Sequence, residues 1–353
     1  MNKAKETLSV CIPVYNMAQT VKDAIASVLN QTYKNFELII VDNASTDGTT
    51  ELIRSIRDKR IRFFVNKTNI GAQKNLYECI RRMKTDIIVT MAADDVLEKN
   101  ALMKIYQVFA EDHDIAVTNR SYFHFDYDIK KPIRVMHRFD KDEIITIRTN
   151  YKKLTKAIDC SCQVSGMAFR RKFLKKSYFD QKTKPFVSIP TIYLSILKSH
   201  KTAIIKDDIV ACRTTNNTMV KGGAHNPIFN YSPSASWHNM IRRILPEKKY
   251  QPFREYFDRY FIGSNYIGLV QIKNFGGFKQ LIKEIQYMIK VRGDNVVNPV
   301  FWFFVLGCII TPRFILIPLV NWYKSRINSK FIEKRKFEYD VTLRHSREGG
   351  NPV

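Results

Sequence analysis

The stretch IIVTMAADDVL, residues 87–97, gives the strongest indication of the fold. Its first four residues, Ile87 to Thr90, are apolar or β-branched on both faces, which is typical of a buried strand in a parallel sheet. Asp94 and Asp95 follow at the carboxyl end of that strand, the edge where open α/β sheets bind ligands. Adjacent carboxylates are costly there unless a cation or ligand hydroxyls satisfy them, and hard divalent cations prefer oxygen ligands. We therefore expect a metal-assisted binding site at this pair.

The residues before this stretch predict alternating strands and helices. Short apolar runs predict strands at 8–13, 36–41 and 61–65, and the strand at 87–90 is the fourth in the series. Apolar residues recur at helical spacing between these strands, and the first such stripe consists of Val21, Ala24, Ile25, Val28 and Leu29. Strands that alternate with helices of this length form βαβ units. The fold class is therefore α/β, with a parallel sheet and right-handed crossovers.

Asp42 ends the second predicted strand, at the same sheet edge as Asp94 and Asp95. Neither GxGxxG nor GxxxxGK[ST] occurs, so a dinucleotide fingerprint and a Walker phosphate loop are both unsupported. A metal on the acidic pair would neutralise phosphates instead. The structural alternatives are that Asp42 is a turn residue and that the pair caps the helix beginning near Glu98, while Asp47 is expected to cap the helix after the second strand.

Four stretches then follow one another in a recognisable order and spacing. They are LSVCIPVYN (8–16), NQTYKNFELIIVDNASTDGT (30–49), NKTNIGAQKN (66–75) and AADDVLEKNAL (92–102). In this arrangement the chain resembles the family 2 glycosyltransferases over about residues 8 to 215. That family has the GT-A fold, a Rossmann-like α/β fold, and uses nucleotide-diphospho-sugars as donors. The resemblance implies a nucleotide-sugar-binding domain.

The resemblance also implies where the nucleotide lies. By this likeness, Pro13, Val14 and Tyr15 line the pocket for the nucleotide base, and Asp42 reads the edge of the base. These residues end the first two predicted strands.

The remaining donor-site residues are implied in the same way. Asn69 and Gly71 lie in the loop that shapes the nucleotide site. Asp94 and Asp95 fall on the family's DxD region, which holds Mn²⁺ or Mg²⁺ together with the ribose and diphosphate. The family's common pattern is Asp-x-Asp-Asp, and this chain departs from it with Ala92 at the first acidic position. One oxygen ligand for the metal is therefore missing.

A second departure concerns the catalytic base. The family usually carries a Glu-Asp pair in a helix, but the matching segment here reads Ser-Ile-Pro-Thr at 188–191, which resembles O-antigen abequosyltransferase-like enzymes. Inverting transfer needs a carboxylate to take the proton of the attacking hydroxyl and a positive charge beside the departing diphosphate. The candidate bases are Asp159 and Asp180, and the base is otherwise unassigned. Arg213 is the candidate diphosphate contact.

Chain length and composition predict three regions. We expect a GT-A domain at 1–225, a helical region at 226–330 and a basic, disordered tail at 331–353. The net charge of +25 implies an anionic partner, which could be nucleic acid, an acidic sugar nucleotide or anionic lipid.

An apolar, aromatic-rich segment at 299–323 favours lipid among these partners. It is interrupted by Pro312, Arg313 and Pro318, and basic residues flank it on both sides. Two short helices lying in the headgroup region fit this pattern better than one spanning helix or a buried core helix. We expect peripheral or monotopic attachment to the cytoplasmic face of the bacterial inner membrane.

Together these features predict a glycosyltransferase of bacterial surface polysaccharide synthesis. It would transfer a sugar from a nucleotide-diphosphate donor to a hydroxyl of a glycan acceptor linked to a polyprenyl lipid, with inversion. Ala92 and the missing Glu-Asp pair leave open a catalytically impaired scaffold. A nucleic-acid-binding protein is a further alternative, but no nucleic acid partner is expected because the basic runs flank the apolar C-terminal segment.

Overall fold

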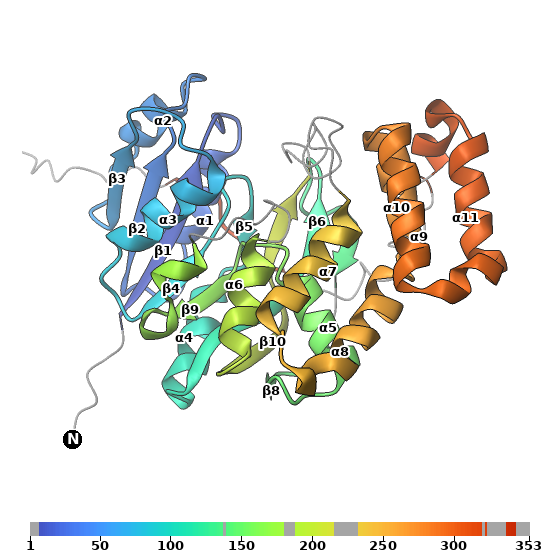
Figure 1. Cartoon of the computed structure of the whole chain (residues 1–353). Coiled ribbons are helices and arrows are strands. Elements are labelled where there is room, and N and C mark those ends of the chain that lie inside the picture. Colours follow the sequence, from blue (N-terminus) through green and yellow to red (C-terminus); the bar gives the residue numbers. More distant parts are fainter. Residues whose placement is uncertain are drawn as a thin grey trace, which may run out of the picture.

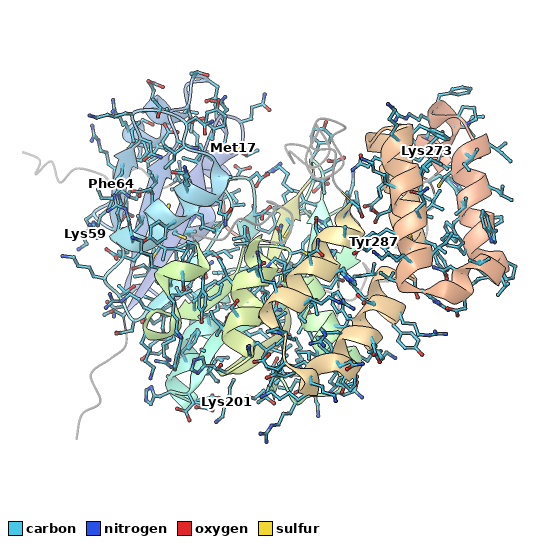
Figure 2. The ribbon with its side chains drawn as sticks, viewed as in Figure 1. Met17, Lys59, Phe64, Lys201, Lys273 and Tyr287 are labelled. Carbon is cyan, nitrogen blue, oxygen red and sulfur yellow. The ribbon has the colours of Figure 1, made fainter. Side chains whose placement is uncertain are left out.

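The protein is described by a computed structural model. The structure describes residues 7–136, 139–179, 188–214, 232–319, 322 and 337–343. Within this part of the chain, ten strands form one sheet, and helices of the C-terminal region stand beside it (Figure 1). Met17, after the first strand, and Lys273, in the C-terminal helices, lie well apart (Figure 2).

The elements alternate along the first half of the chain, as predicted. The strands are β1 (Leu8–Val14), β2 (Phe36–Asp42), β3 (Ile61–Val65), β4 (Ile87–Thr90), β5 (Val96–Leu97), β6 (Ile115–Phe125), β7 (Pro132–Met136), β8 (Glu143–Ile145), β9 (Met167–Arg170) and β10 (Lys201–Arg213). The helices are α1 (Val21–Leu29), α2 (Thr49–Ser55), α3 (Ala72–Arg82), α4 (Ala101–Glu111), α5 (Tyr151–Cys160), α6 (Ser188–Leu197), α7 (Pro233–Ile244), α8 (Gln251–Phe257), α9 (Tyr266–Phe275), α10 (Phe278–Val291) and α11 (Pro299–Ile310).

The sheet is mixed, with the strand order β3-β2-β1-β4-β9-β6-β10-β5. β1 to β4 are parallel neighbours, as are β6 and β10, so the predicted parallel sheet is confirmed for these strands. It is wrong for β9, which runs antiparallel between β4 and β6, and for β5, which runs antiparallel to β10. β9 runs antiparallel to its neighbours because the chain, after helix α5, enters the sheet at the edge opposite to the one where the parallel strands begin.

Alternate residues of the first strands face opposite layers of helices, which explains why these strands are apolar throughout. Val10 and Ile12 of β1 pack into the cluster that contains α1, while Cys11 between them packs into the cluster under α3. β1 lies centrally between β2 and β4, so its end and theirs meet at one edge of the sheet.

The C-terminal helices α9, α10 and α11 have a small apolar core of their own. α11 contributes Phe301, Val305 and Cys308 to it, which recur on one face of the helix. The other faces of α11 are also apolar and are exposed, including Phe303 and Ile310, each 74% exposed. Among the described residues, no helix combines the length and the apolar character needed to cross a bilayer.

Arg313, which interrupts the apolar segment, caps a neighbouring helix. Its Nε donates to the carbonyl of Lys273 at 2.8 Å, and its Nη2 donates to that of Gly276, at the end of α9. The guanidinium thus satisfies carbonyls that a helix leaves without partners at its C-terminus.

Residues 337–343, here called the C-terminal strap, differ from the disorder expected for 331–353. They pack against the sheet, where Phe337, Tyr339 and Val341 contact an apolar cluster beside β5. Apolar side chains at every second position, with an extended backbone between them, fit such a surface. The basic composition around the strap concealed this short pattern.

Candidate active site

Asp42 ends β2 and is fully buried at the carboxyl edge of the sheet. Its Oδ1 accepts hydrogen bonds from the backbone N–H of Ser45 at 3.1 Å and from the Ser45 hydroxyl at 2.5 Å, and its Oδ2 accepts one from the Thr50 hydroxyl. Asp42 therefore organises the turn that leads to α2, and both of its oxygens have fixed directions. The N-cap of α2 is Gly48, so the prediction that Asp47 caps this helix is wrong. Asp47 instead accepts from the N–H of Thr49 at 3.1 Å, within the turn before the helix.

The residues expected around the nucleotide base lie next to Asp42. Val14 is aligned with Asp42 in the parallel register of β1 and β2, and it is buried. Pro13 is half-buried, whereas Tyr15 follows the strand and is 42% exposed. The tyrosine ring is thus the accessible part of this segment, at the edge where Asp42 ends its strand.

The loop with Asn69 and Gly71 is fixed by a chain of asparagine amides. Asn43 Nδ2 donates to Asn69 Oδ1 at 2.7 Å, and that oxygen also accepts from the N–H of Gly71 at 2.9 Å. Gly71 has a φ of 86°, which favours glycine, and directly precedes α3. Asn66 and Asn75 continue the chain toward β2. The loop is therefore held in one conformation beside the end of β2.

Asp95 is almost fully buried, and protein donors surround it. Its Oδ2 accepts from the Ser165 hydroxyl at 2.5 Å and from Gln163 Nε2 at 3.2 Å, while its Oδ1 accepts from the N–H of Arg213 at 2.8 Å. The loop before β9 and the end of β10 thus converge on one carboxylate. Neither Asp94 nor Asp95 caps α4, because Asn100 begins that helix and Glu98 accepts its N–H at 3.0 Å.

Asp94 differs from its neighbour, since no side chain among the described residues donates a hydrogen bond to its carboxylate. Burial raises the pKa of Asp94 to about 6, against weaker opposing effects of its own backbone N–H and of Arg213. Burial also raises the pKa of Asp95, and the charge of Asp94 adds to that effect. A buried Asp95 beside a half-buried Asp94 that has no side-chain donor matches the environment that attracts a cation.

Arg213 connects the acidic pair to α1. Its Nε donates to the carbonyl of Asp94 at 3.1 Å, its Nη2 pairs with Asp23 at 2.9 Å, and the guanidinium lies 4.7 Å from the centre of the Phe125 ring. Thr20, before α1, donates to the carbonyl of Ala93 at 3.2 Å. The structure thus places the predicted diphosphate contact directly beside the predicted metal site.

A second arginine, Arg120 of β6, supports this arrangement from below and is completely buried. Its guanidinium donates to the carbonyls of Cys160, Gln163 and Ser165 at 2.6 to 3.3 Å. Those carbonyls belong to the loop whose side chains hold Asp95. Without Arg120, these buried carbonyls would lack a hydrogen-bond donor, which is unfavourable. Arg120 therefore stabilises the conformation of the loop.

The candidate bases are placed less completely. Asp159 lies in the last turn of α5 and is half-buried, directly before the loop that holds Asp95. Asp180 lies outside the described residues. The residues around 188–191, where the resemblance suggests a carboxylate pair, form the start of α6 and carry none.

The structure adds residues that the sequence did not indicate. Ser165 and Gln163 hold Asp95, and Asp23 pairs with Arg213. Serine and glutamine carry no sequence signal of their own, and Asp23 matches an ordinary acidic residue in a first helical turn.

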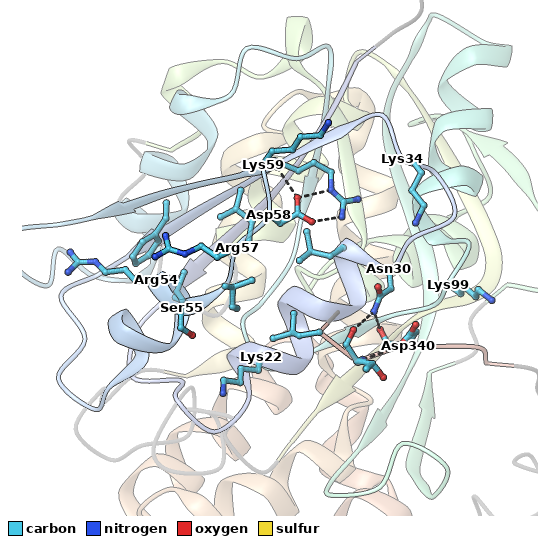
Figure 3. A pocket seen from close by; sticks show the side chains of 18 of the residues that line it. Lys22, Asn30, Lys34, Arg54, Ser55, Arg57, Asp58, Lys59, Lys99 and Asp340 are labelled. Atoms are coloured by element: carbon cyan, nitrogen blue, oxygen red, sulfur yellow. Dashed lines mark hydrogen bonds and ion pairs between the residues drawn. The ribbon is translucent and has the colours of Figure 1, made fainter. Parts of the chain in front are cut away.

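A broad groove of about 2000 Å³ opens elsewhere on the domain, between α1, the connection from α2 to β3, and the strap (Figure 3). Lysines and arginines line it, together with Asn30 and Asp340, which lie close together. None of the predicted site residues lines this groove. The acidic pair and the groove are therefore separate features.

A divalent metal is compatible with the acidic pair, but the protein supplies few ligands. No group of three or more His, Cys, Asp or Glu side chains converges within the described part of the chain. Ala92 offers only its N–H, which donates to the Ser165 hydroxyl at 2.8 Å. Asp94 is the carboxylate best placed to bind a cation, because protein donors already occupy Asp95.

Comparison with known proteins shows which family this part of the chain matches. Residues 9–179 match the model of glycosyl transferase family 2. The matched residues extend from β1 through β9 and include Asp42, Asp94 and Asp95.

Similar proteins include several glycosyltransferases. The glycosyltransferase GlyG of Streptococcus pneumoniae is 31% identical over 124 residues, 34% of this chain and 40% of that protein. An uncharacterized glycosyltransferase of Haemophilus influenzae is 32% identical over 123 residues, 34% of this chain and 49% of that protein. The chain thus matches less than half the length of each of these relatives. An Escherichia coli enzyme, UDP-Glc:alpha-D-GlcNAc-diphosphoundecaprenol beta-1,3-glucosyltransferase WfgD, is 28% identical over 56% of this chain and 72% of that protein.

Solved structures of similar fold confirm the predicted α/β class. TarS 1–349 of S. aureus in complex with UDP has a TM-score of 0.58 at 14% identity, covering 95% of this chain and 94% of that one. A mannosyltransferase from Pyrobaculum calidifontis in complex with GDP-Man and Mn²⁺ has a TM-score of 0.50 at 12% identity, covering 94% and 89%. At these identities the likeness concerns the fold alone.

Replacing Ser165 with alanine tests how Asp95 is held. The substitution removes a donor from a buried carboxylate, so the free energy of unfolding should fall by about 1–3 kcal/mol. Ser55→Ala is the matched control, because the Ser55 hydroxyl bonds only the exposed carbonyl of Leu52 and its loss should cost less than about 0.5 kcal/mol. Chemical denaturation measures both, and equal values for the two variants would contradict the structural role of Ser165.

The raised pKa of Asp94 predicts a pH-dependent stability in metal-free buffer. Between about pH 4 and pH 6 the folded state keeps a proton that the unfolded state releases, so stability falls as pH rises through this window. Asp94→Asn removes the effect, and the variant should gain on the order of 2 kcal/mol relative to the wild type across the window, with no further change above it. Denaturation at a series of pH values measures this difference. Parallel curves of stability against pH for the wild type and Asp94→Asn would contradict the raised pKa of Asp94. Asp114→Asn, at an exposed position, serves as the control.

Proposed function

We propose that this protein is a glycosyltransferase that transfers a sugar from a nucleotide-diphosphate donor to a hydroxyl of a glycan acceptor. The observation that carries the proposal is the acidic pair at the carboxyl edge of a family 2 domain, with Arg213 bonded directly beside it. Asp42 and the loop of Asn69 and Gly71 lie at the same edge. This edge therefore offers one area for the base, one for the ribose and one for the phosphates.

Each residue has a defined part in the proposed donor site. Tyr15 is accessible and offers its ring to the base, next to Pro13 and Val14. Asp42 reads the edge of the base, in an orientation that its bonds to Ser45 fix in advance. Preorganised side chains of this kind need no rearrangement when the ligand binds.

Arg213 provides a positive charge near the departing diphosphate. Its side chain is 11% exposed and is held by Asp23 and by the carbonyl of Asp94, so it acts from a fixed position. A preorganised cation stabilises the negative charge that develops on a leaving group. Asp94, with Asp95 behind it, would hold Mn²⁺ or Mg²⁺, which when bound neutralises charge on the diphosphate.

The acceptor hydroxyl must lose a proton as it attacks the sugar. Asp159 and Asp180 remain the proposed bases, and in-line attack opposite the leaving group gives the proposed inversion. Asp159 has the support of its position, at the end of α5 and next to the loop that contacts Asp95. A carboxylate near the hydroxyl can remove its proton as the new bond forms.

We propose a polyprenyl-linked glycan as the acceptor, in the synthesis of bacterial surface polysaccharides. The name of the similar Escherichia coli enzyme specifies a substrate linked to diphosphoundecaprenol. The C-terminal helices of this chain also expose an unusual amount of apolar surface. An acceptor with a lipid anchor is found at a membrane, so the two observations agree.

Attachment to an anionic membrane surface is the corresponding proposal for the C-terminal region, at the cytoplasmic face of the inner membrane. Exposed apolar side chains on α11 and the residues after it include Trp302, Phe303, Ile310 and Phe314. Residues 263–319 carry six lysines and arginines against two acids, which suits anionic headgroups. A helix lying in the interface buries its apolar face and keeps cations near phosphate.

Ligand binding and catalysis test the enzymatic proposal. Thermal unfolding should shift upward with one nucleoside diphosphate in the presence of Mn²⁺ or Mg²⁺, because a ligand specific for the folded state stabilises it. Asp94→Asn should abolish the metal-dependent part of this shift and lower sugar transfer to a lipid-linked glycan by about 100-fold or more. Asp114→Asn, at an exposed position after α4, should leave both unchanged. Unchanged transfer by Asp94→Asn would refute the site, and binding by the wild type without transfer to any acceptor would favour a scaffold.

Vesicle flotation tests the membrane proposal. The double variant Phe303→Asp/Ile310→Asp changes two exposed side chains, so the fold should be retained while binding to phosphatidylserine-containing vesicles falls about tenfold or more. Ile144→Asp alters an exposed isoleucine on β8 and should bind as the wild type does. Equal binding by all three proteins would contradict the assignment of this surface.

A further inference from the structure

The C-terminal strap covers an apolar surface that adjoins the acidic pair. Phe337, Tyr339 and Val341 of the strap pack on a buried cluster, with the Phe337 ring edge-on to the Phe123 ring at 5.0 Å between centroids. The cluster consists of Val96, Phe123, Phe125 and Ala211. Its members come from β5, β6 and β10, three strands that end around the donor site.

Hydrogen bonds fix the strap at both of its ends. The N–H of Lys99, two residues after β5, donates to the carbonyl of Glu338 at 2.7 Å. Asn30, at the end of α1, donates from Nδ2 to the carbonyls of Asp340 and Thr342 at 3.1 and 2.9 Å (Figure 3). The strap therefore joins α1 to the segment that follows the acidic pair, although more than 230 residues separate Lys99 from Glu338 in sequence.

The cluster under the strap is connected to the proposed donor site in two ways. Val96 is the residue after Asp95, and its backbone pairs with Ala211, two residues before Arg213. The Phe125 ring in the same cluster lies against the Arg213 guanidinium at 4.7 Å. Any shift of β5 or of Phe125 therefore moves the side chains that the donor site uses.

β5 is a very short strand at one end of the strand order. It is two residues long, and among the described strands it pairs with β10, while the N–H of Leu97 also donates to the Ser27 hydroxyl at 3.2 Å. Leu97 packs into the main core on one side, whereas the opposite face, with Val96, packs under the strap. Short strands with one neighbour are weakly ordered unless packing fixes them.

We propose that the C-terminal strap is a positioning element of the donor site. It holds Val96 and Phe125, and through them Asp95 and Arg213, in the geometry that binds a nucleoside diphosphate. This inference rests on the proposed function. It also means that a truncation meant to remove only the exposed apolar helices would remove a part of the donor site, because the strap follows those helices in the chain.

Three variants of the full chain test the proposal. Phe337→Ala removes the largest contact of the strap, and Asn30→Ala removes its tether without altering the cluster. Truncation after Leu343 removes only residues that follow the strap and is the matched control. For each protein, titration with UDP, GDP, CDP and dTDP in the presence of Mn²⁺ gives the affinity, and amide hydrogen exchange reports the protection of residues 96–97.

We expect Phe337→Ala to weaken binding of the nucleotide that the wild type prefers by about tenfold, and Asn30→Ala by about threefold, within the range of effects transmitted through packed side chains. Exchange at residues 96–97 should become faster in both variants, and the truncated protein should match the wild type. Phe337→Leu, which refills most of the volume, should restore affinity. If Phe337→Ala does not fold, Asn30→Ala decides the question by the same titration.

Other results would overturn the proposal. Lower thermal stability with unchanged affinity and unchanged exchange at 96–97 would show that the strap only covers apolar surface. Equal losses in the truncated protein would assign the effect to residues after the strap. Failure of the wild type to bind any of these nucleotides would instead overturn the proposed function and this inference together, so the two failures are distinguishable.

Discussion

The buried carboxylate of Asp95 is the constraint around which this domain is organised. A charge without solvent requires donors, and Ser165, Gln163 and the N–H of Arg213 supply them from distant parts of the chain. To bring these donors together, the loop before β9 must turn toward β5, and the buried Arg120 holds its carbonyls there. Asp94 is left with its carboxylate at the sheet edge and with a raised pKa. Asp95 thus has the structural role, and Asp94 is the acid to which we assign binding in our proposal.

Sequence patterns predicted much of the first half of the fold. β3 and β4 coincide with the predicted strands, and for β4 the reason is a short apolar run that is buried on both faces. The antiparallel direction of β9 could not be predicted in this way, because the direction of a strand depends on the edge at which the chain enters the sheet. Amino-acid composition does not indicate that edge. Asp42 could be found because it ends β2, and Asp94 and Asp95 because they follow β4 at the same edge. Ser165 and Asp23 could not, because their function lies only in the partners that folding gives them.

In the C-terminal region, some features could be predicted from the sequence and others became clear only from the structure. Its apolar character was evident from composition, and the structure adds that α11 buries one narrow face and exposes the rest. Arg313 had suggested a charge inside an apolar layer, but it caps α9 and so is compatible with a helical hairpin at an interface. The strap lay in a tail expected to be disordered. Three alternating apolar side chains are too short a pattern to stand out, and only the cluster they cover gives them meaning.

The most direct measurement of the central claim is anomalous diffraction at the manganese edge from crystals grown with Mn²⁺ and the preferred nucleoside diphosphate. The account predicts one strong peak within coordination distance of the Asp94 carboxylate, between it and the diphosphate, with Asp95 still bonded to Ser165. A nucleotide bound at another place, or bound at this edge with Asp94 turned away from both metal and phosphate, would contradict it.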